Sequence, residues 1–249
     1  MLYEVPYNFD ENLLKFYQKN LAFINYLYLP PYRDDSANTR SSIQTNTRGR
    51  CYMPNTREEY EYHLHKISEA GLRFVILWQV KDLNMSFDTL NYYSKLKTSG
   101  FIVASDENAA FIKQTNPNLL VICSIVQKTS FDILKKDLTN YDYVILYYTF
   151  NRALDALKKL EHLKDKIVIM PNTLCDVNCP SVHHWFPTKD KPFKPSDCSM
   201  PNHLDMCGLI LPEHLKIFDN YVGGYKLQGR EYPTEAIKYL CHFYFIRVL

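Results

Sequence analysis

Short apolar runs rich in β-branched and aromatic residues alternate with amphipathic stretches along nearly the whole chain. This alternation predicts strands and helices in turn, as in a parallel α/β fold. Eight runs predict strands: "LYEVPYN" from residue 2, "FINYLYL" from 23, "RFVILWQV" from 73, "FIVASD" from 101, "LLVICSIV" from 119, "YVILYY" from 143, "KIVIMPN" from 166 and "YVGGYKLQ" from 221. A helical pattern follows each run, and eight β/α units in 249 residues match a (β/α)8 TIM barrel in number and size. We therefore predict one barrel domain spanning residues 1–249.

Polar residues and glycines mark where several of these helices begin and end. "TREE" from residue 56 places Thr56 at an N-cap and Glu59 three residues later, which is the pattern of a capping box. Gly71 is expected to end the same helix, because glycine enters the left-handed region without steric cost. Asp106 is expected to open a later helix, and Gly100 to close one.

Two connections are too long to be simple links, residues 30–55 and the cysteine-rich segment 173–211. Both follow predicted strands, the second and the seventh. In a barrel both therefore lie on the C-terminal face, where active sites are built. The first is rich in arginine, so it is either a solvated mobile segment or an anion-binding lid. If it is a lid, its substrate-binding candidates include Arg48 and Arg50.

Composition excludes several classes of protein. The formal net charge is only +2, from 29 basic and 27 acidic residues, so no overall field favours nucleic acid or membrane surfaces. Nucleic acid stays an open partner but is not favoured. The N-terminus lacks a signal-peptide pattern and no apolar stretch is long enough for a membrane span, so we expect a cytoplasmic protein. The common motifs of zincins, α/β-hydrolases, P-loop proteins and Rossmann dehydrogenases are absent.

Four of the seven cysteines fall within 33 residues, and this clustering is the strongest chemical signal in the chain. In a reducing compartment, clustered thiols more often serve metal binding or catalysis than disulfides. Four thiolates could hold a tetrahedral zinc ion or an iron–sulfur cluster, and the spacing does not choose between them. Buried, inert thiols are the third reading. The four residues are Cys175, Cys179, Cys198 and Cys207.

Other polar residues lie near predicted strand ends or in the cysteine-rich segment. His183 is a candidate ligand or acid–base group. Lys226 and Arg230 are expected to project from the last strand and could hold an anionic substrate or form a salt bridge inside the barrel. A further set could line the pocket, although each member could equally be a helix cap or a bonded loop residue: Gln79, Asp106, Asn151, Arg152 and Asn172. We count Lys226, Arg230, His183 and Arg152 as catalytic candidates.

The segment "LDMCGLILPEHLKIFDNYVGGYKLQGREYPTEAIKYLCHFYF", residues 204–245, resembles the C-terminal barrel signature of the U32 peptidase-like family. The family hallmark "KIEGR" appears here as "KLQGR", so Gln228 stands where the family has glutamate. Three further segments resemble the family in the same order: "VASDENAAFIKQTNP" from 103, "YTFNRALDAL" from 148 and "NTLCDVNCP" from 172.

The resemblance implies a TIM barrel, and a 4Fe-4S cluster on the four cysteines that match those of cluster-containing members. Here the first cysteine pair is closer together than is usual in the family. Family members include peptidases and enzymes similar to oxygen-independent hydroxylases, some of which act in pairs, so a homologous partner subunit is expected. We favour an iron–sulfur oxidoreductase or modifying enzyme acting on a small molecule, a peptide or a partner-presented substrate. The alternatives are a U32-type peptidase and a non-catalytic scaffold subunit with a structural zinc or cluster.

Overall fold

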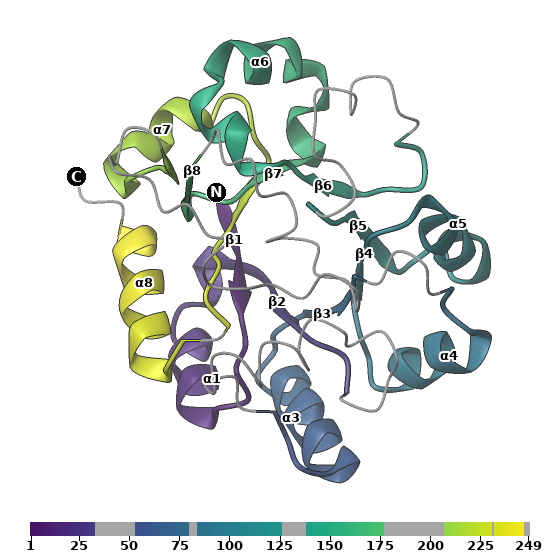
Figure 1. Ribbon diagram of the computed structural model, residues 1–249. Coiled ribbons are helices and arrows are strands. Elements are labelled where there is room, and N and C mark those ends of the chain that lie inside the picture. Colours follow the sequence, from purple (N-terminus) through teal and green to yellow (C-terminus); the bar gives the residue numbers. More distant parts are fainter. Residues whose placement is uncertain (33–52, 80–83, 126–137, 177–206, 231, 247–249) are drawn as a thin grey trace.

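The computed structural model describes residues 1–32, 53–79, 84–125, 138–176, 207–230 and 232–246. Eight parallel strands form a closed barrel in the order β1-β10-β7-β6-β5-β4-β3-β2 (Figure 1). Each lies within or against one of the eight predicted runs, so the predicted (β/α)8 barrel is confirmed. The barrel strands are β1 (Leu2–Pro6), β2 (Ile24–Leu29), β3 (Phe74–Trp78), β4 (Gly100–Val103), β5 (Leu120–Cys123), β6 (Tyr143–Ile145), β7 (Ile167–Ile169) and β10 (Gly224–Lys226).

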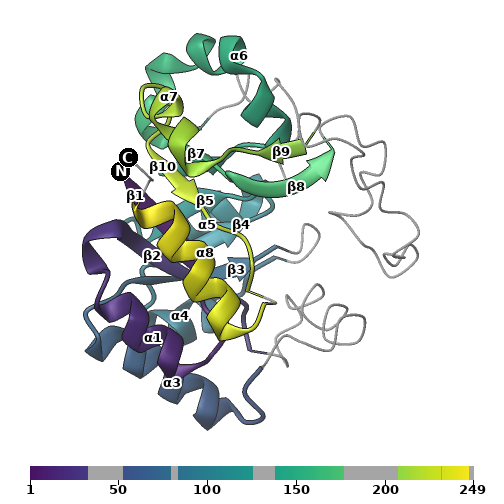
Figure 2. The same ribbon diagram turned by 90° about the vertical axis from the view of Figure 1, so that its left-hand side faces the viewer.

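Helices surround the barrel and cover its outer face (Figures 1 and 2). They are α1 (Glu11–Gln18), η1 (Leu21–Phe23), α3 (Arg57–Glu69), α4 (Phe87–Lys95), α5 (Asp106–Thr115), η3 (Tyr148–Arg152), α6 (Leu154–Lys159), η4 (Glu161–Lys166), η8 (Pro212–His214), α7 (Leu215–Phe218) and α8 (Thr234–Ile246). The helix expected after β5 falls on residues 126–137, which lie outside the described part of the chain. None of the described helices is long and apolar enough to cross a membrane.

Strand β1 joins the last strand, β10, and so closes the barrel. The Tyr3 hydroxyl donates to the carbonyl of Tyr244 in α8 at 2.9 Å, so Tyr3 faces the helical layer. The Tyr225 hydroxyl likewise reaches out to Asp219, just after α7, at 2.7 Å. Successive strand residues face opposite sides of a sheet. Glu4 and Lys226, each one residue further along, therefore face the barrel interior.

Two of the predicted helix boundaries are confirmed at α3. The Thr56 side chain accepts from the Glu59 amide at 3.1 Å, and the Glu59 carboxylate accepts from the Asn55 amide at 2.7 Å. The reciprocal bond of the capping box thus reaches one residue further back than the standard pattern. Gly71 follows the helix with a φ of 74°, as expected for a residue in the left-handed region.

Of the other two boundary predictions, the helix start at Asp106 is confirmed in α5, although its N-cap is a different residue, and the helix end at Gly100 is wrong. Ser105, and not Asp106, is the N-cap of α5, because the Ser105 hydroxyl accepts from the Asn108 amide at 3.2 Å. Asp106 is the first helical residue. Gly100 does not close α4 but begins β4, since α4 ends at Lys95 and Lys97 takes the left-handed conformation with a φ of 63°.

The cysteine-rich segment is not a plain loop at its two ends, contrary to the prediction for residues 173–211. Strand β8 (Asn172–Asp176) and strand β9 (Cys207–Leu209) pair in an antiparallel two-stranded sheet. Figure 2 shows this sheet as a separate pair of strands beside the barrel. Residues 177–206 between the two strands lie outside the described residues, as do residues 33–52 of the connection after β2.

Candidate functional site

The β8–β9 sheet is attached to the barrel by two consecutive residues of η3. The Asn151 side-chain amide donates to the carbonyls of Met170 at 2.8 Å and Gly208 at 2.5 Å. The Arg152 guanidinium donates to the carbonyls of Cys207 and Leu209, both at 2.8 Å. Asn151 and Arg152 thus position the backbone of β9, and the predicted substrate and catalytic roles of these two residues stay predictions.

A second attachment joins β8 to the segment after β10. Asn172 donates to the Gln228 carbonyl at 3.0 Å and accepts from the Gln228 amide at 2.8 Å. The Gln228 side chain in turn donates to the Thr173 hydroxyl at 2.6 Å. The structure therefore brings two predicted site residues, Asn172 and Gln228, into direct contact at the C-terminal mouth of the barrel.

The same sheet brings together the first and last cysteines of the predicted cluster. Cys207 is fully buried on β9, and its Cα pairs with that of Asp176 on β8. The backbone of Cys175 is therefore adjacent to that of Cys207, although 31 residues separate them in sequence. Cys179 and Cys198 lie outside the described residues. Within the residues that the structure describes, no group of three or more histidine, cysteine or acidic side chains forms a metal site.

A buried polar row that the sequence analysis missed crosses the barrel interior. Glu4 of β1 pairs in register with Lys226 of β10 on one side and with Tyr26 of β2 on the other. Glu4 is 1% exposed and Lys226 is 6% exposed. The Lys226 ammonium lies 3.7 Å from the centre of the Tyr28 ring, in cation–π geometry. The apolar pattern of "LYEVPYN" predicts the strand. Nothing in this segment indicates that its one acidic residue, Glu4, would lie beside a residue more than 220 positions away.

Burial dominates the electrostatics of this row. Desolvation raises the pKa of Glu4 from 4.5 to about 7, although the positive charge of Lys226 and the nearby Tyr26 hydroxyl both lower it. Desolvation also raises the pKa of Tyr26 well above its ordinary value, so this phenol stays neutral. The Tyr26 hydroxyl is close enough to affect Glu4 but is not placed for a hydrogen bond of standard geometry. The carboxyl of Glu4 can therefore gain or lose a proton near neutral pH.

The remaining predicted residues fall into two groups. Gln79 directly follows β3, as predicted, whereas Asp106 lies at the start of α5, three residues after β4. Gln79 donates to the Ser124 hydroxyl at 2.9 Å, and Asp106 accepts from the Tyr141 hydroxyl at 2.7 Å, so both are engaged within the scaffold. Arg230 is buried after β10. Three others lie outside the described residues: Arg48, Arg50 and His183.

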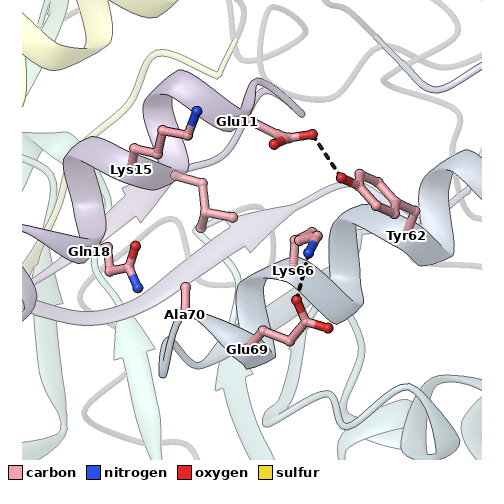
Figure 3. Close-up of a pocket in the computed structure, with 8 residues that line it drawn as sticks. Glu11, Lys15, Gln18, Tyr62, Lys66, Glu69 and Ala70 are labelled. Atoms are coloured by element: carbon pink, nitrogen blue, oxygen red, sulfur yellow. Dashed lines mark hydrogen bonds and ion pairs between the residues drawn. The ribbon is translucent and has the colours of Figure 1, made fainter.

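A groove of about 390 Å³ lies on the outside of the barrel between α1 and α3 (Figure 3). Two polar pairs lie across it or along it. The Tyr62 hydroxyl donates to Glu11 at 3.0 Å, and Lys66 pairs with Glu69 at 2.8 Å. Its lining includes none of the predicted site residues, so the candidate site is the barrel mouth.

The described residues thus define a (β/α)8 barrel with a polar row in its interior and a cysteine-bearing sheet beside β7. No family model matches the sequence, and no curated protein matches it either.

Several solved structures share the fold. The U32 peptidase Mk0906 is 12% identical, with 94% of each chain covered and a TM-score of 0.54. A protein from Aquifex aeolicus VF5 is 14% identical, with 99% of this chain and 92% of that one covered and a TM-score of 0.53. A tryptophan synthase from M. tuberculosis is 10% identical, with 99% and 91% covered and a TM-score of 0.51. At these identities the likeness is one of fold alone, and the shared fold is the TIM barrel that the sequence predicted.

Proposed function

We propose that this protein is an enzyme whose active site lies at the C-terminal mouth of the barrel, beside a metal centre held by four thiolates. The observation that supports the metal centre is the β8–β9 pairing, in which Cys207 pairs with Asp176, the residue that follows Cys175. Cys179 and Cys198 would complete the ligand set. Active sites of TIM barrels are built at this face, and two of the structures with the same fold are named as enzymes, a peptidase and a synthase.

A 4Fe-4S cluster is the proposed occupant, with zinc as the alternative. Soft thiolate ligands suit either group. A cluster held by all four thiolates would supply electron transfer. Under this proposal the protein is a cytoplasmic oxidoreductase or modifying enzyme, possessing the chemistry of an oxygen-independent hydroxylase. Its substrate is a small molecule, a peptide or a group presented by a homologous partner subunit.

The residues of this chain have separate roles in the proposal. Lys226 and Arg230 hold the anionic part of the substrate from β10. His183 exchanges a proton, and Arg152 fixes the β9 strand that carries Cys207. Further substrate contacts are assigned to the rim of the barrel: Arg48, Arg50, Gln79, Asp106, Asn151, Asn172 and Gln228.

The test is anaerobic purification of the full chain, followed by iron, sulfide and zinc analysis and an absorption spectrum. Cys175→Ala is compared with Cys241→Ala, a matched control in which the thiol is buried in α8. About four irons and four sulfides per chain, lost in Cys175→Ala and kept in Cys241→Ala, would support the cluster.

Other results count against it. One zinc without sulfide would replace the cluster with a structural site and favour the scaffold alternative. A metal-free protein of full stability would overturn the proposal and leave the peptidase alternative. That alternative is supported by fold likeness to a protein named as a U32 peptidase.

A further inference from the structure

Within the described residues, no hydrogen bond fixes the side chain of Glu4 or Tyr26 of the polar row in place. Both carboxylate oxygens of Glu4 and the hydroxyl of Tyr26 are buried, and none has a hydrogen-bond partner among the described residues. A buried polar group left unsatisfied costs about 1–3 kcal/mol. Apolar side chains of similar size would fill the same space at lower cost, so the row calls for an explanation other than packing.

The row lies next to the mouth of the barrel. Lys226 is the last residue of β10, and the following residue, Leu227, accepts from the Tyr28 hydroxyl at 2.6 Å. The amide of Leu227 donates to the Glu4 carbonyl at 2.9 Å. The chain then continues directly to Gln228 and its contacts with β8. Lys226 is therefore the member of the row that lies at the C-terminal end of its strand, with Glu4 paired beside it on β1.

We propose that this row is a proton-coupled binding site for an oxyanion, the carboxylate or phosphate group of a small molecule, in which Lys226 binds the oxyanion and Glu4 takes up the accompanying proton. The proposal rests on the part of the proposed function that places the active site at the barrel mouth, and it is independent of the metal centre. One anionic charge and one proton from solvent enter together, so the charge of the barrel interior changes little when a carboxylate binds.

The coupling follows from the charges that face Glu4. Lys226 from β10 favours the ionised carboxylate, while burial opposes it. The other facing groups are the neutral phenols of Tyr26 and Tyr28 from β2, with Tyr143 of β6 and Arg73 acting on Tyr26 from further away. An oxyanion on Lys226 cancels the positive charge of Lys226 that stabilises the carboxylate. The pKa of Glu4 then rises from about 7, and the carboxyl binds a proton.

The experiment is calorimetric titration of the full chain with acetate and, separately, with sulfate. Sulfate stands in for phosphate because it does not change protonation near neutral pH. Each titration is repeated in buffers of different ionisation enthalpy, which counts the protons bound per anion. We expect uptake approaching one proton at about pH 8, with affinity falling by up to about tenfold per pH unit above about 7. The stronger of the two anions identifies the oxyanion class.

Three variants test the assignment. Glu4→Gln should abolish proton uptake and the pH dependence of affinity in this range. Lys226→Met should abolish anion binding. Glu11→Gln, a matched loss of a carboxylate on the exposed face of α1, should leave both unchanged.

Three results would overturn the proposal: no binding of either anion to the native protein, equal proton uptake in Glu4→Gln, or unchanged binding in Lys226→Met. If Glu4→Gln does not fold, the number of protons that the native protein takes up per bound anion still tests the proposal, because a value near zero would overturn it. Cys175→Ala separates this proposal from that of the metal centre. A variant that loses metal but still binds the anion with proton uptake would show that the two sites are independent.

Discussion

The guanidinium of Arg152 donates to the main-chain carbonyl of Cys207 at 2.8 Å and to that of Leu209 at the same distance. One side chain of η3 therefore holds both ends of β9. This strand has only three residues, so its own ladder with β8 provides few bonds. The position of Cys207 depends on a residue more than 50 positions earlier in the sequence.

Arg152→Lys should loosen β9 without unfolding the barrel. Lysine has a single ammonium in place of the planar fork that reaches two carbonyls. Hydrogen bonds from a charged donor contribute about 1.5–3 kcal/mol each, so the local opening of β9 should become at least tenfold more frequent. Hydrogen exchange of the amides of Cys207–Leu209 measures this opening.

The control for this change is Lys158→Ala, which removes only an exposed ion pair with Asp155. Unaltered exchange in β9 of Arg152→Lys would show that the two hydrogen bonds do not hold the strand. If the metal proposal is correct, the same variant should also release metal to a chelator faster than the control does.

Glu4→Gln should change how stability depends on pH. The pKa of Glu4 is raised from 4.5 to about 7 in the folded protein, so between these values the folded state binds a proton that the unfolded state has lost. The contribution of Glu4 to stability is therefore greatest below about pH 4.5 and falls as the pH rises to about 7, by about 3 kcal/mol in total. Glutamine carries no charge at any pH and should remove this loss.

Urea unfolding at about pH 5 and at about pH 8 measures the effect. The variant should gain up to about 3 kcal/mol relative to the native protein on going to the higher pH. Glu11→Gln, on the exposed face of α1, should show no such gain. A difference between Glu4→Gln and the native protein that stays constant with pH would show that Glu4 does not titrate in this interval.

The sequence predicts the barrel because each strand is a short apolar run that is locally distinct. It fails where the structure depends on distant contacts. Strand β9 is only "CGL", too short to be recognised without β8, with which it pairs across residues 177–206. The sequence identifies Lys226 as a site residue, but Glu4 becomes its neighbour only when the first and last strands close the barrel.

Local signals can also mislead about the roles of individual residues. Glycine is common at helix ends, which is why the sequence predicts a helix end at Gly100. In the structure Gly100 lies in β4, where the neighbouring strand leaves no room for a side chain. An added Cβ would lie 2.0 Å from the carbonyl oxygen of Leu120 in β5. Asn172 and Asn151 have the side chains of pocket residues, but their bonds to the backbone are visible only in the folded chain.

Gly100→Ala should therefore destabilise the barrel severely. The atoms in the way belong to the main chain of β5, which cannot rotate aside as a side chain can. Overpacking of this kind costs about 1–3 kcal/mol and more where the backbone must move. Gly71→Ala is the matched comparison, since it meets nothing within 4 Å and loses only the freedom of a residue with a φ of 74°. We expect about 1 kcal/mol there.

Urea midpoints of the two glycine variants measure the difference. Equal destabilisation would show that β4 and β5 can separate enough to accept a methyl group, and would contradict the close strand approach at Gly100.

His63 should make the outer layer of the barrel sensitive to acid. Its ring is buried in α3, where Nδ1 lies 3.0 Å from the Tyr7 hydroxyl. Burial lowers the pKa of His63 below its ordinary 6.5, although Glu59, Glu11 and Asp10 act in the opposite direction. Below about pH 6.5 the unfolded state therefore binds a proton that the folded state resists.

The contribution of His63 to stability should thus be fully present above pH 6.5 and should be lost as the pH is lowered through the folded pKa of His63. His63→Phe should lose about 1 kcal/mol at neutral pH with the hydrogen bond to Tyr7, but its stability should fall less steeply in acid. Thermal unfolding between about pH 7.5 and 5.5 measures both effects.

His65→Gln, two positions away on the exposed face of α3, should keep the native acid sensitivity, because its side chain is solvated in both states. A curve for His63→Phe that runs parallel to that of the native protein would place the acid sensitivity in other groups, since His63 would then have the same pKa in both states.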